Sequence, residues 1–157
     1  HGLGEFPDNR DLLYGRAFVA AKVGKIDMAE RDLLNIIQRD PNNAEALNAL
    51  GYTLADRTNR YEEALKYIQR ALKLRPDDYF VLDSMGWVQY RLGNYEEAVK
   101  YLRRAMDASN DTEVAAHLGE VLWTMGHQDQ ARDVWHKALK ASPNSKPILE
   151  VMKRLQP

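Results

Sequence analysis

Residues 93–98 read Gly-Asn-Tyr-Glu-Glu-Ala and residues 59–64 read Asn-Arg-Tyr-Glu-Glu-Ala, so four identical residues recur 34 positions later. The alanine that ends each stretch recurs with spacings of 35, 34 and 33 residues, at Ala29, Ala64, Ala98 and Ala131. A second series of small residues has the same period, at Ala17, Gly51, Gly86 and Gly119. Self-similarity at this period predicts an array of repeated supersecondary units.

The repeated residues have a physical meaning as pairs of helices. Small residues recur where two helices must approach closely, because a larger side chain would push the helices apart. Glycines at 24, 93 and 126 suit the left-handed ends of first helices, and prolines at 41, 76 and 143 stop second helices from continuing. Asn94 followed by Glu97 predicts a side-chain cap for the helix after Gly93.

With these motifs the chain resembles the tetratricopeptide (TPR) repeat family, whose unit is two antiparallel helices in 34 residues. The best match covers residues 79–111, with Gly86, Tyr95 and Ala98 at the family's positions. The resemblance implies an all-α fold, a right-handed α-α superhelix of four helix pairs and a C-terminal capping helix. The predicted segments are a lead or helix stump at 1–9, repeats at 10–43, 44–78, 79–111 and 112–145, and a cap at 146–157.

Several positions depart from the family pattern. The second repeat has one extra residue within 57–60, and the third is one residue short and lacks its proline near 108–111. Arg16 stands where a leucine is usual, so the first repeat is either degenerate or packs on something outside this sequence. A helix at 148–155 with a polar outer face, including Arg154, is expected to cap the last repeat. We therefore expect the chain to be the C-terminal end of a longer array.

Composition excludes several classes of function. The 157 residues carry a formal net charge of −1, which argues against binding to nucleic acid through bulk charge. The sequence has no cysteine, so disulfides, thiolate zinc sites and thiol catalysis are ruled out. No apolar run approaches the roughly 20 residues of a membrane span.

The resemblance also implies which residues face a partner, because the first helix of each TPR pair lines the concave face. Carried onto this sequence, the positions predict a partner-binding groove of Tyr14, Phe18, Asn48, Tyr52, Phe80, Asp83, Trp87, Tyr90, Arg91, His117, Glu120 and Trp123. Aromatic side chains give large contact area at low entropy cost, which suits a protein or peptide site.

Two interpretations of this groove remain open. The aromatic residues form a binding surface, in which case we expect Trp87, Tyr90 and Trp123 to be the most exposed. Alternatively, some of them pack between neighbouring first helices. The Lys, Asn and Arg positions with which some TPR proteins hold chaperone tails are occupied here by Tyr14, Phe18, Ala49, Phe80 and Ser84, so a chaperone-tail receptor is not expected.

The sequence predicts no catalytic centre, metal site or cofactor. The four histidines show no His-Glu-x-x-His spacing, and no phosphate-binding loop or nucleophile elbow is present. Asp83 and Glu120 are expected to lie near one another across adjacent helices. Groove carboxylates more often meet basic groups on a ligand than perform acid–base chemistry. An enzyme or small-molecule binder would need a closed pocket, which an open array does not suggest.

Segments between Ala46 and Leu155, such as Leu-Asp-Ser-Met-Gly-Trp-Val-Gln-Tyr-Arg-Leu-Gly at 82–93, resemble long TPR lipoproteins of Pseudomonas and other proteobacteria. The resemblance implies a periplasmic location with an outer-membrane anchor outside this sequence. It further implies an adaptor that brings peptidoglycan hydrolases to a carboxyl-terminal processing protease. The alternatives are a general TPR peptide-binding scaffold, in the envelope or the cytoplasm, and a structural cap of a longer array. Self-association of the aromatic face is a further expectation.

Overall fold

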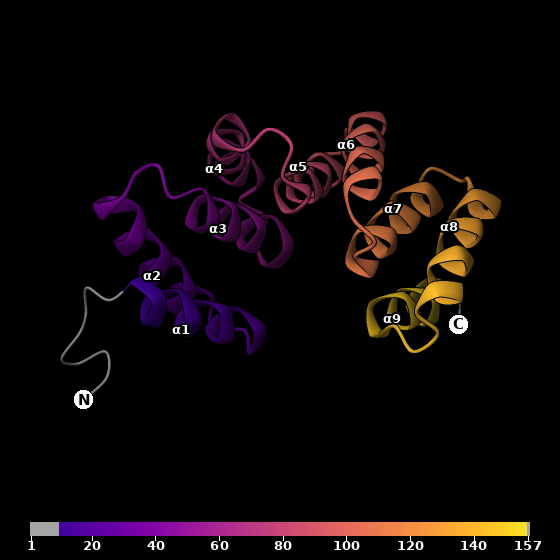
Figure 1. Cartoon of the computed structure of the whole chain (residues 1–157), viewed down its shortest axis with the longest axis horizontal. Coiled ribbons are helices and arrows are strands. Elements are labelled where there is room, and N and C mark those ends of the chain that lie inside the picture. The colour runs from indigo at the N-terminus through magenta and orange to yellow at the C-terminus, as the bar shows by residue number, and fades with distance from the viewer. Residues whose placement is uncertain (1–9, 157) are drawn as a thin grey trace. The chain divides into compact units, whose positions relative to one another are not determined.

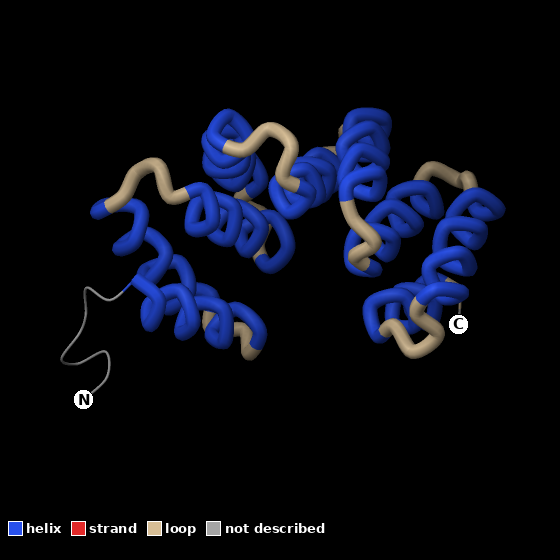
Figure 2. The backbone as a smooth tube through the Cα atoms, viewed as in Figure 1, coloured by secondary structure: helices blue, strands red, loops and turns tan. Residues whose placement is uncertain are grey.

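The computed structural model describes residues 10–156, and within this range the chain forms helices and no strands (Figures 1 and 2). The predicted lead or stump at 1–9 lies outside the described residues. The expectation of an all-α fold is confirmed. The chain divides into two compact units, one up to Pro76 and the other from Asp77.

Unit 1 contains two helix hairpins. The first consists of α1 (Arg10–Lys22) and α2 (Ile26–Arg39), and the second of α3 (Ala44–Arg57) and α4 (Tyr61–Leu74). Helix α2 also packs on α3, so the second helix of one pair covers the first helix of the next. The core of this unit lies between these helices and includes Leu33, Leu47, Leu54 and Ile68.

Unit 2 repeats this arrangement and adds a final helix. Its pairs are α5 (Tyr79–Arg91) with α6 (Tyr95–Ala108), and α7 (Thr112–Thr124) with α8 (Gln128–Ala141). Helix α6 packs on α7. The last helix, α9 (Lys146–Leu155), packs on both α7 and α8 and buries Ile148 and Val151.

The small residues of the repeat lie where the two helices of a pair meet. A Cβ built on Gly51 would come 2.4 Å from Cγ1 of Ile68, and one on Gly86 would come 2.6 Å from Cγ of Leu102. At Gly119 a Cβ would come 1.9 Å from Nε1 of Trp135. Glycine at each position therefore leaves room for one large side chain from the second helix. This side chain is aliphatic in the second and third pairs and is the Trp135 indole in the last pair.

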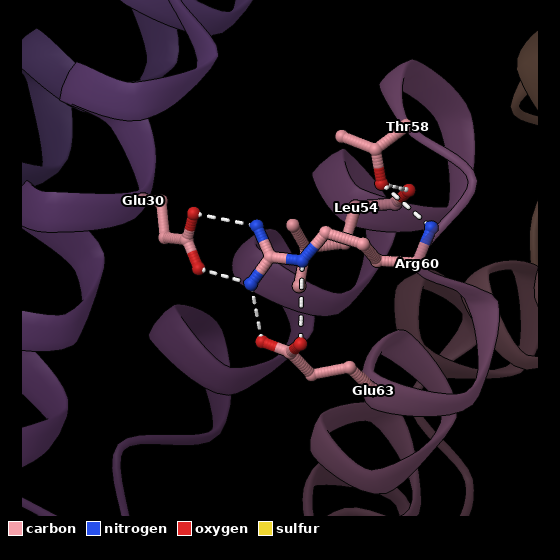
Figure 3. Close-up of polar contacts among 5 residues, drawn as sticks. All are labelled: Glu30, Leu54, Thr58, Arg60 and Glu63. Carbon is pink, nitrogen blue, oxygen red and sulfur yellow. Dashed lines mark hydrogen bonds and ion pairs between the residues drawn. The ribbon is translucent and has the colours of Figure 1, made fainter.

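The turns inside the pairs are built in two ways. Gly24, Gly93 and Gly126 have φ of 84°, 87° and 90°, the left-handed conformation that glycine adopts without strain. The second pair has no such glycine. There the Thr58 hydroxyl donates to the Leu54 carbonyl at 2.6 Å and accepts from the Arg60 N–H at 3.0 Å (Figure 3). The extra residue of this repeat lengthens α3, which has 14 residues where α1, α5 and α7 have 13, and the turn at 58–60 has the same three residues as the other turns.

Arg60 also ties this turn to the preceding pair. Its guanidinium donates to both oxygens of Glu30 on α2, at 2.8 and 2.6 Å, and to Glu63 in the first turn of α4, which begins at the next residue (Figure 3). These hydrogen bonds lower the pKa of Glu30. Arg60 and Glu30 thus form a bidentate, charge-assisted pair, a kind of hydrogen bond that is stronger than a neutral one.

First and second helices begin differently. Helices α3, α5, α7 and α9 each begin with a side-chain cap, which comes from Asn43, Asp78, Asp111 and Ser145 respectively. The predicted cap at Asn94 is wrong, because its side chain donates to Gln89 Oε1 at 2.8 Å. The backbone N–H of Asn94 bonds to the Gln89 carbonyl, so the turn at Gly93 sets the conformation of Asn94 before any cap can form.

Candidate functional site

The first-helix face of unit 1 carries four of the predicted groove residues. Tyr14 and Phe18 are four residues apart on α1, and Asn48 and Tyr52 are four apart on α3, so each pair shares one side of its helix. Burial, and to a lesser degree the Glu45 carboxylate of α3, raises the pKa of Tyr14. Helices α1 and α3 also contact one another, so the two faces adjoin.

Two features of this face are suited to contact with another molecule. The Phe18 ring is 56% exposed, and Nζ of Lys22 lies 4.7 Å from its centroid. The Oδ1 atom of Asn48 is buried and accepts no hydrogen bond from any residue in the described part of the chain. A buried amide oxygen without a donor is costly, so this position favours an incoming N–H group.

The first-helix face of unit 2 is organised by contacts among its own residues. Oδ1 of Asp83 on α5 lies 2.8 Å from Nδ1 of His117 on α7, and both side chains are buried. The Nδ1–H tautomer donates to this carboxylate. The Trp87 ring stacks on the His117 imidazole with centroids 4.2 Å apart, so the polar pair packs against an aromatic ring.

A second group of contacts lies further along the same helices. The Tyr90 hydroxyl donates to Glu120 Oε2 at 3.1 Å and lies 3.0 Å from Oγ1 of Thr124. Burial is the main cause that raises the pKa of Tyr90. Arg154 of α9 donates to the other oxygen of Glu120. The Glu120 carboxylate therefore links α5, α7 and α9.

These contacts correct the predicted exposure of the aromatic groove residues. Trp87 is only 5% exposed, because His117 and Tyr90 cover its ring, and so it is not among the most exposed residues. Tyr90 and Trp123 are half-buried.

The structure adds hydrogen bonds to two other expectations. Asp83 and Glu120, expected near one another, each bond to a different residue, His117 and Tyr90. Arg154, expected on the polar outer face of the capping helix, has a side chain that is 58% exposed and also bonds to Glu120.

The remaining predicted residues of unit 2 lie at its edges. Phe80 at the start of α5 is 55% exposed and stacks on Tyr79 with centroids 4.3 Å apart. Trp123 stacks on Trp135, with the Arg132 guanidinium 5.3 Å from its ring centroid. Arg91 is half-buried in the last turn of α5. The structure thus brings together Asp83, Trp87, Tyr90, His117 and Glu120, and leaves Phe80 apart.

Sequence reasoning missed that these residues bond to one another. A signal was present, since Asp83 and His117, Tyr90 and Thr124, and Glu120 and Arg154 are each separated by 34 residues. Equivalent positions in consecutive repeats lie side by side, so complementary residue types at the repeat distance indicate a contact between them.

Within residues 10–156 no group of three or more His, Asp or Glu side chains is placed to hold a metal ion. In the same range, no helix combines the length and the apolar character needed to cross a membrane.

Comparison with known proteins identifies relatives of the chain. A TPR repeat-containing protein of Pseudomonas aeruginosa is 51% identical over 119 residues, which are 76% of this chain and 20% of that protein. The mouse protein O-mannosyl-transferase TMTC1 is 25% identical over 154 residues, 95% of this chain and 16% of that protein. The chain thus spans one fifth or less of the length of these two relatives.

Two solved structures share the fold. A thermophilic TPR protein of Thermus thermophilus superimposes with a TM-score of 0.84 at 24% identity, covering 98% of this chain and 82% of that chain. The Pseudomonas aeruginosa protein pilF gives a TM-score of 0.77 at 24% identity, covering 93% of this chain and 67% of that chain. At these identities the likeness shows the helical TPR fold alone.

Sequence profiles of the tetratricopeptide repeat match residues 14–79, 79–111 and 112–137. This fold typically provides a non-catalytic scaffold for protein–protein interaction. The successive matches, the repeated helix pairs and the Gly-to-large-residue contacts within them agree, and the chain belongs to the tetratricopeptide-repeat family.

Proposed function

We propose that the chain is a non-catalytic scaffold that receives an extended segment of a partner protein on the first-helix face of unit 1. The observation that carries this proposal is the pairing of an exposed Phe18 with a buried, unbonded Asn48 Oδ1 on adjoining helix faces. An extended segment supplies both backbone N–H donors and apolar side chains. The aromatic ring offers contact area, and the Asn48 amide, once its side chain turns outward, accepts a backbone N–H and fixes the register of the incoming segment.

The corresponding face of unit 2 supports a different role. Asp83, Tyr90, His117 and Glu120 already satisfy one another, so a ligand would have to displace those hydrogen bonds. Displacing a satisfied buried pair has a desolvation cost, whereas Asn48 gains a bond on binding. Unit 2 therefore holds its helices in place, and unit 1 offers the accessible contact surface.

For the biological setting, we infer a role as part of a periplasmic adaptor attached to the outer membrane of a proteobacterium. The high identity to a Pseudomonas TPR protein supports a bacterial scaffold of this kind. The partners that we infer from the resemblance to envelope TPR lipoproteins are a carboxyl-terminal processing protease and its peptidoglycan-hydrolase substrates. The competing settings are a general TPR scaffold elsewhere in the cell and a purely structural end of a longer array.

A binding measurement with matched variants tests both the proposed site in unit 1 and the proposed adaptor role. The purified chain is immobilised, and the protease and one peptidoglycan hydrolase are added separately in a biolayer experiment. Phe18→Ala is compared with Phe80→Ala, because the two rings are equally exposed on first helices of different units. We expect Phe18→Ala to weaken binding about 10-fold, as for a central aromatic contact, and Phe80→Ala to leave it unchanged.

The outcomes test the assignment of the binding site to unit 1 separately from the adaptor role. Equal loss in both variants, or loss only in Phe80→Ala, contradicts the assignment to unit 1 but retains the adaptor. Absence of binding by the unmodified chain to either protein contradicts the adaptor role. Circular dichroism of each variant establishes that the helices are intact before the comparison is made.

A further inference from the structure

The first-helix face of unit 1 carries its charged, polar and aromatic residues in three rows. Each row pairs a residue of α1 with the residue 34 positions later on α3, and α1 contacts α3. Equivalent positions of consecutive repeats lie side by side, so each row runs from one helix to the other. In order along the helices, the acidic row is Asp11 with Glu45, the middle row is Tyr14 with Asn48, and the aromatic row is Phe18 with Tyr52.

The Glu45 carboxylate is accessible to an incoming cation. Glu45 is exposed, and no basic residue within 10–156 forms an ion pair with it. Its row neighbour Asp11 lies 4.0 Å from Nε of Arg10, with both side chains more than half exposed. A surface pair of this kind contributes little and leaves the carboxylate open to other partners. The acidic row therefore presents negative charge that unit 1 does not compensate through Glu45.

The Tyr14 ring lies between the acidic row and the aromatic row. It is half-buried, and burial first and the Glu45 charge second raise the pKa of its hydroxyl. Lysine and arginine have long aliphatic stems that pack on such a ring while the charged end reaches a carboxylate. Their charge is also attracted to the face of an aromatic ring. The acidic and middle rows together are thus suited to one basic side chain.

The opposite end of the face has a different charge. The Phe18 ring is 56% exposed, and Nζ of Lys22 lies 4.7 Å from its centroid. This ammonium group disfavours a second cation at the aromatic row but not an apolar side chain. The face therefore distinguishes the two ends of a segment that has a basic residue at one end and an apolar residue at the other.

A carboxylate in the first turn of a helix also stabilises that helix through its dipole. Glu113 has the same place in α7 as Glu45 has in α3, because each is the second residue of its helix, and both are exposed. The dipole accounts equally for both carboxylates. Glu45 differs because it belongs to the face that carries Tyr14 and Phe18, so Glu113 is the matched control for its charge.

We propose that the partner segment received by unit 1 carries a lysine or arginine that binds Glu45 against the Tyr14 ring, and an apolar side chain that packs on Phe18. This inference rests on the proposed function and specifies the chemistry of the partner. Asp11 and Phe18 are seven residues apart on α1, roughly 10 Å along the helix. An extended chain covers that distance in about three residues. The basic and apolar residues of the partner are therefore about three positions apart, with the basic one near the start of α1.

Selection from a phage library of random dodecapeptides tests this motif without assuming a partner. Parallel selections use the unmodified chain, Phe18→Ala, Glu45→Gln and Glu113→Gln as baits. The two glutamate variants remove the same charge from the second residue of a first helix, one in each unit. Circular dichroism first establishes that every bait is helical. The dissociation constants of selected peptides are then measured by fluorescence anisotropy for all four proteins.

We expect the peptides that are lost with Phe18→Ala to share a lysine or arginine about three positions from an apolar residue. Such a peptide should bind Glu45→Gln about 5-fold more weakly than the unmodified chain, as the loss of one partly solvated ion pair predicts. Its affinity for Glu113→Gln should stay within about 2-fold of the unmodified value, because that charge belongs to unit 2.

The other outcomes separate this inference from the proposed function. Phe18-dependent peptides that lack a basic residue, or that bind Glu45→Gln unchanged, would overturn the inference and retain the site in unit 1. Equal weakening by Glu45→Gln and Glu113→Gln would also overturn it, because the charge of the whole chain would then be responsible. If no selected peptide depends on Phe18, both the site in unit 1 and its preference for a basic residue are wrong.

Discussion

The two units build their first-helix faces from the same repeat but use them differently. In unit 2, Asp83 and His117 form a buried hydrogen bond beneath Trp87, and Glu120 joins three helices. In unit 1, Phe18 is exposed and the Asn48 oxygen has no donor among the described residues. The comparison teaches that equivalent polar positions of consecutive repeats can bond to one another, as in unit 2, or leave a polar atom without a donor among the described residues, as at Asn48 in unit 1.

The largest expected difference comes from removing one polar residue in each unit. Asp83→Ala removes the buried hydrogen bond to His117 Nδ1 and should destabilise unit 2 by about 2–4 kcal/mol. Asn48→Ala removes an unbonded oxygen and adds a good helix former, so unit 1 should change by no more than about 0.5 kcal/mol. Hydrogen exchange of the α3 and α7 amides measures both effects. A comparable loss in Asn48→Ala would show that its oxygen is satisfied in solution.

The glycine contacts provide a second comparison between the units. Gly119→Ala directs a methyl group into the buried indole of Trp135, a rigid ring, and should cost about 2–3 kcal/mol. Gly51→Ala meets mainly the side chain of Ile68, which has rotamers available, and should cost about 1–2 kcal/mol. Urea midpoints followed by circular dichroism give the order. The reverse order would mean that the indole shifts more readily than the isoleucine.

Removing a tyrosine hydroxyl should change the stability of the two units by amounts that differ less than in the glycine comparison. Tyr90→Phe removes hydrogen bonds to Glu120 and Thr124 and should lower the stability of unit 2 by about 1 kcal/mol. Tyr14→Phe should have an effect within about 0.5 kcal/mol, since the Tyr14 ring keeps its packing when the hydroxyl is removed. Thermal unfolding of the two variants measures the difference. If both lose the same amount, the Tyr90 hydroxyl does not strengthen the Glu120 group.

The smallest expected effect is on the stability of unit 1 at acidic pH. Arg60 lowers the folded-state pKa of Glu30, so this pair stabilises the fold above the unfolded carboxyl pKa and the contribution is lost as the pH falls through the folded pKa. Arg60→Gln should cost up to about 1 kcal/mol at pH 7, because the pair is partly solvated. Between pH 5 and pH 3 the variant should lose less stability than the unmodified chain. Parallel pH profiles would contradict this role of Arg60.

The sequence predicted the helix pairs well because their period and small residues depend on local geometry. A glycine such as Gly119 has to lie where a second helix approaches, whatever the partner. The predicted exposure of Trp87 was wrong, because position in the repeat does not distinguish a side chain that faces solvent from one that packs on the next repeat. Trp87 occupies a groove position and is buried under its own neighbours.

The caps show the same limit on a smaller scale. Asn94 has a favourable residue type and spacing for a cap, but the conformation of Gly93 fixes the backbone first. Asp78 and Asp111 follow no such turn and do form caps. Residue type therefore predicts a cap only when the preceding backbone leaves the side chain free to reach the helix.

The aromatic residues of unit 2 also give the molecule an optical asymmetry. All three tryptophans, at positions 87, 123 and 135, belong to this unit, and unit 1 has none. Ultraviolet emission excited at the indole band consequently reports on one half of the chain. Loss of the Trp87–His117 stack should therefore change the emission, whereas local unfolding confined to unit 1 removes none of the tryptophan ring contacts within unit 2.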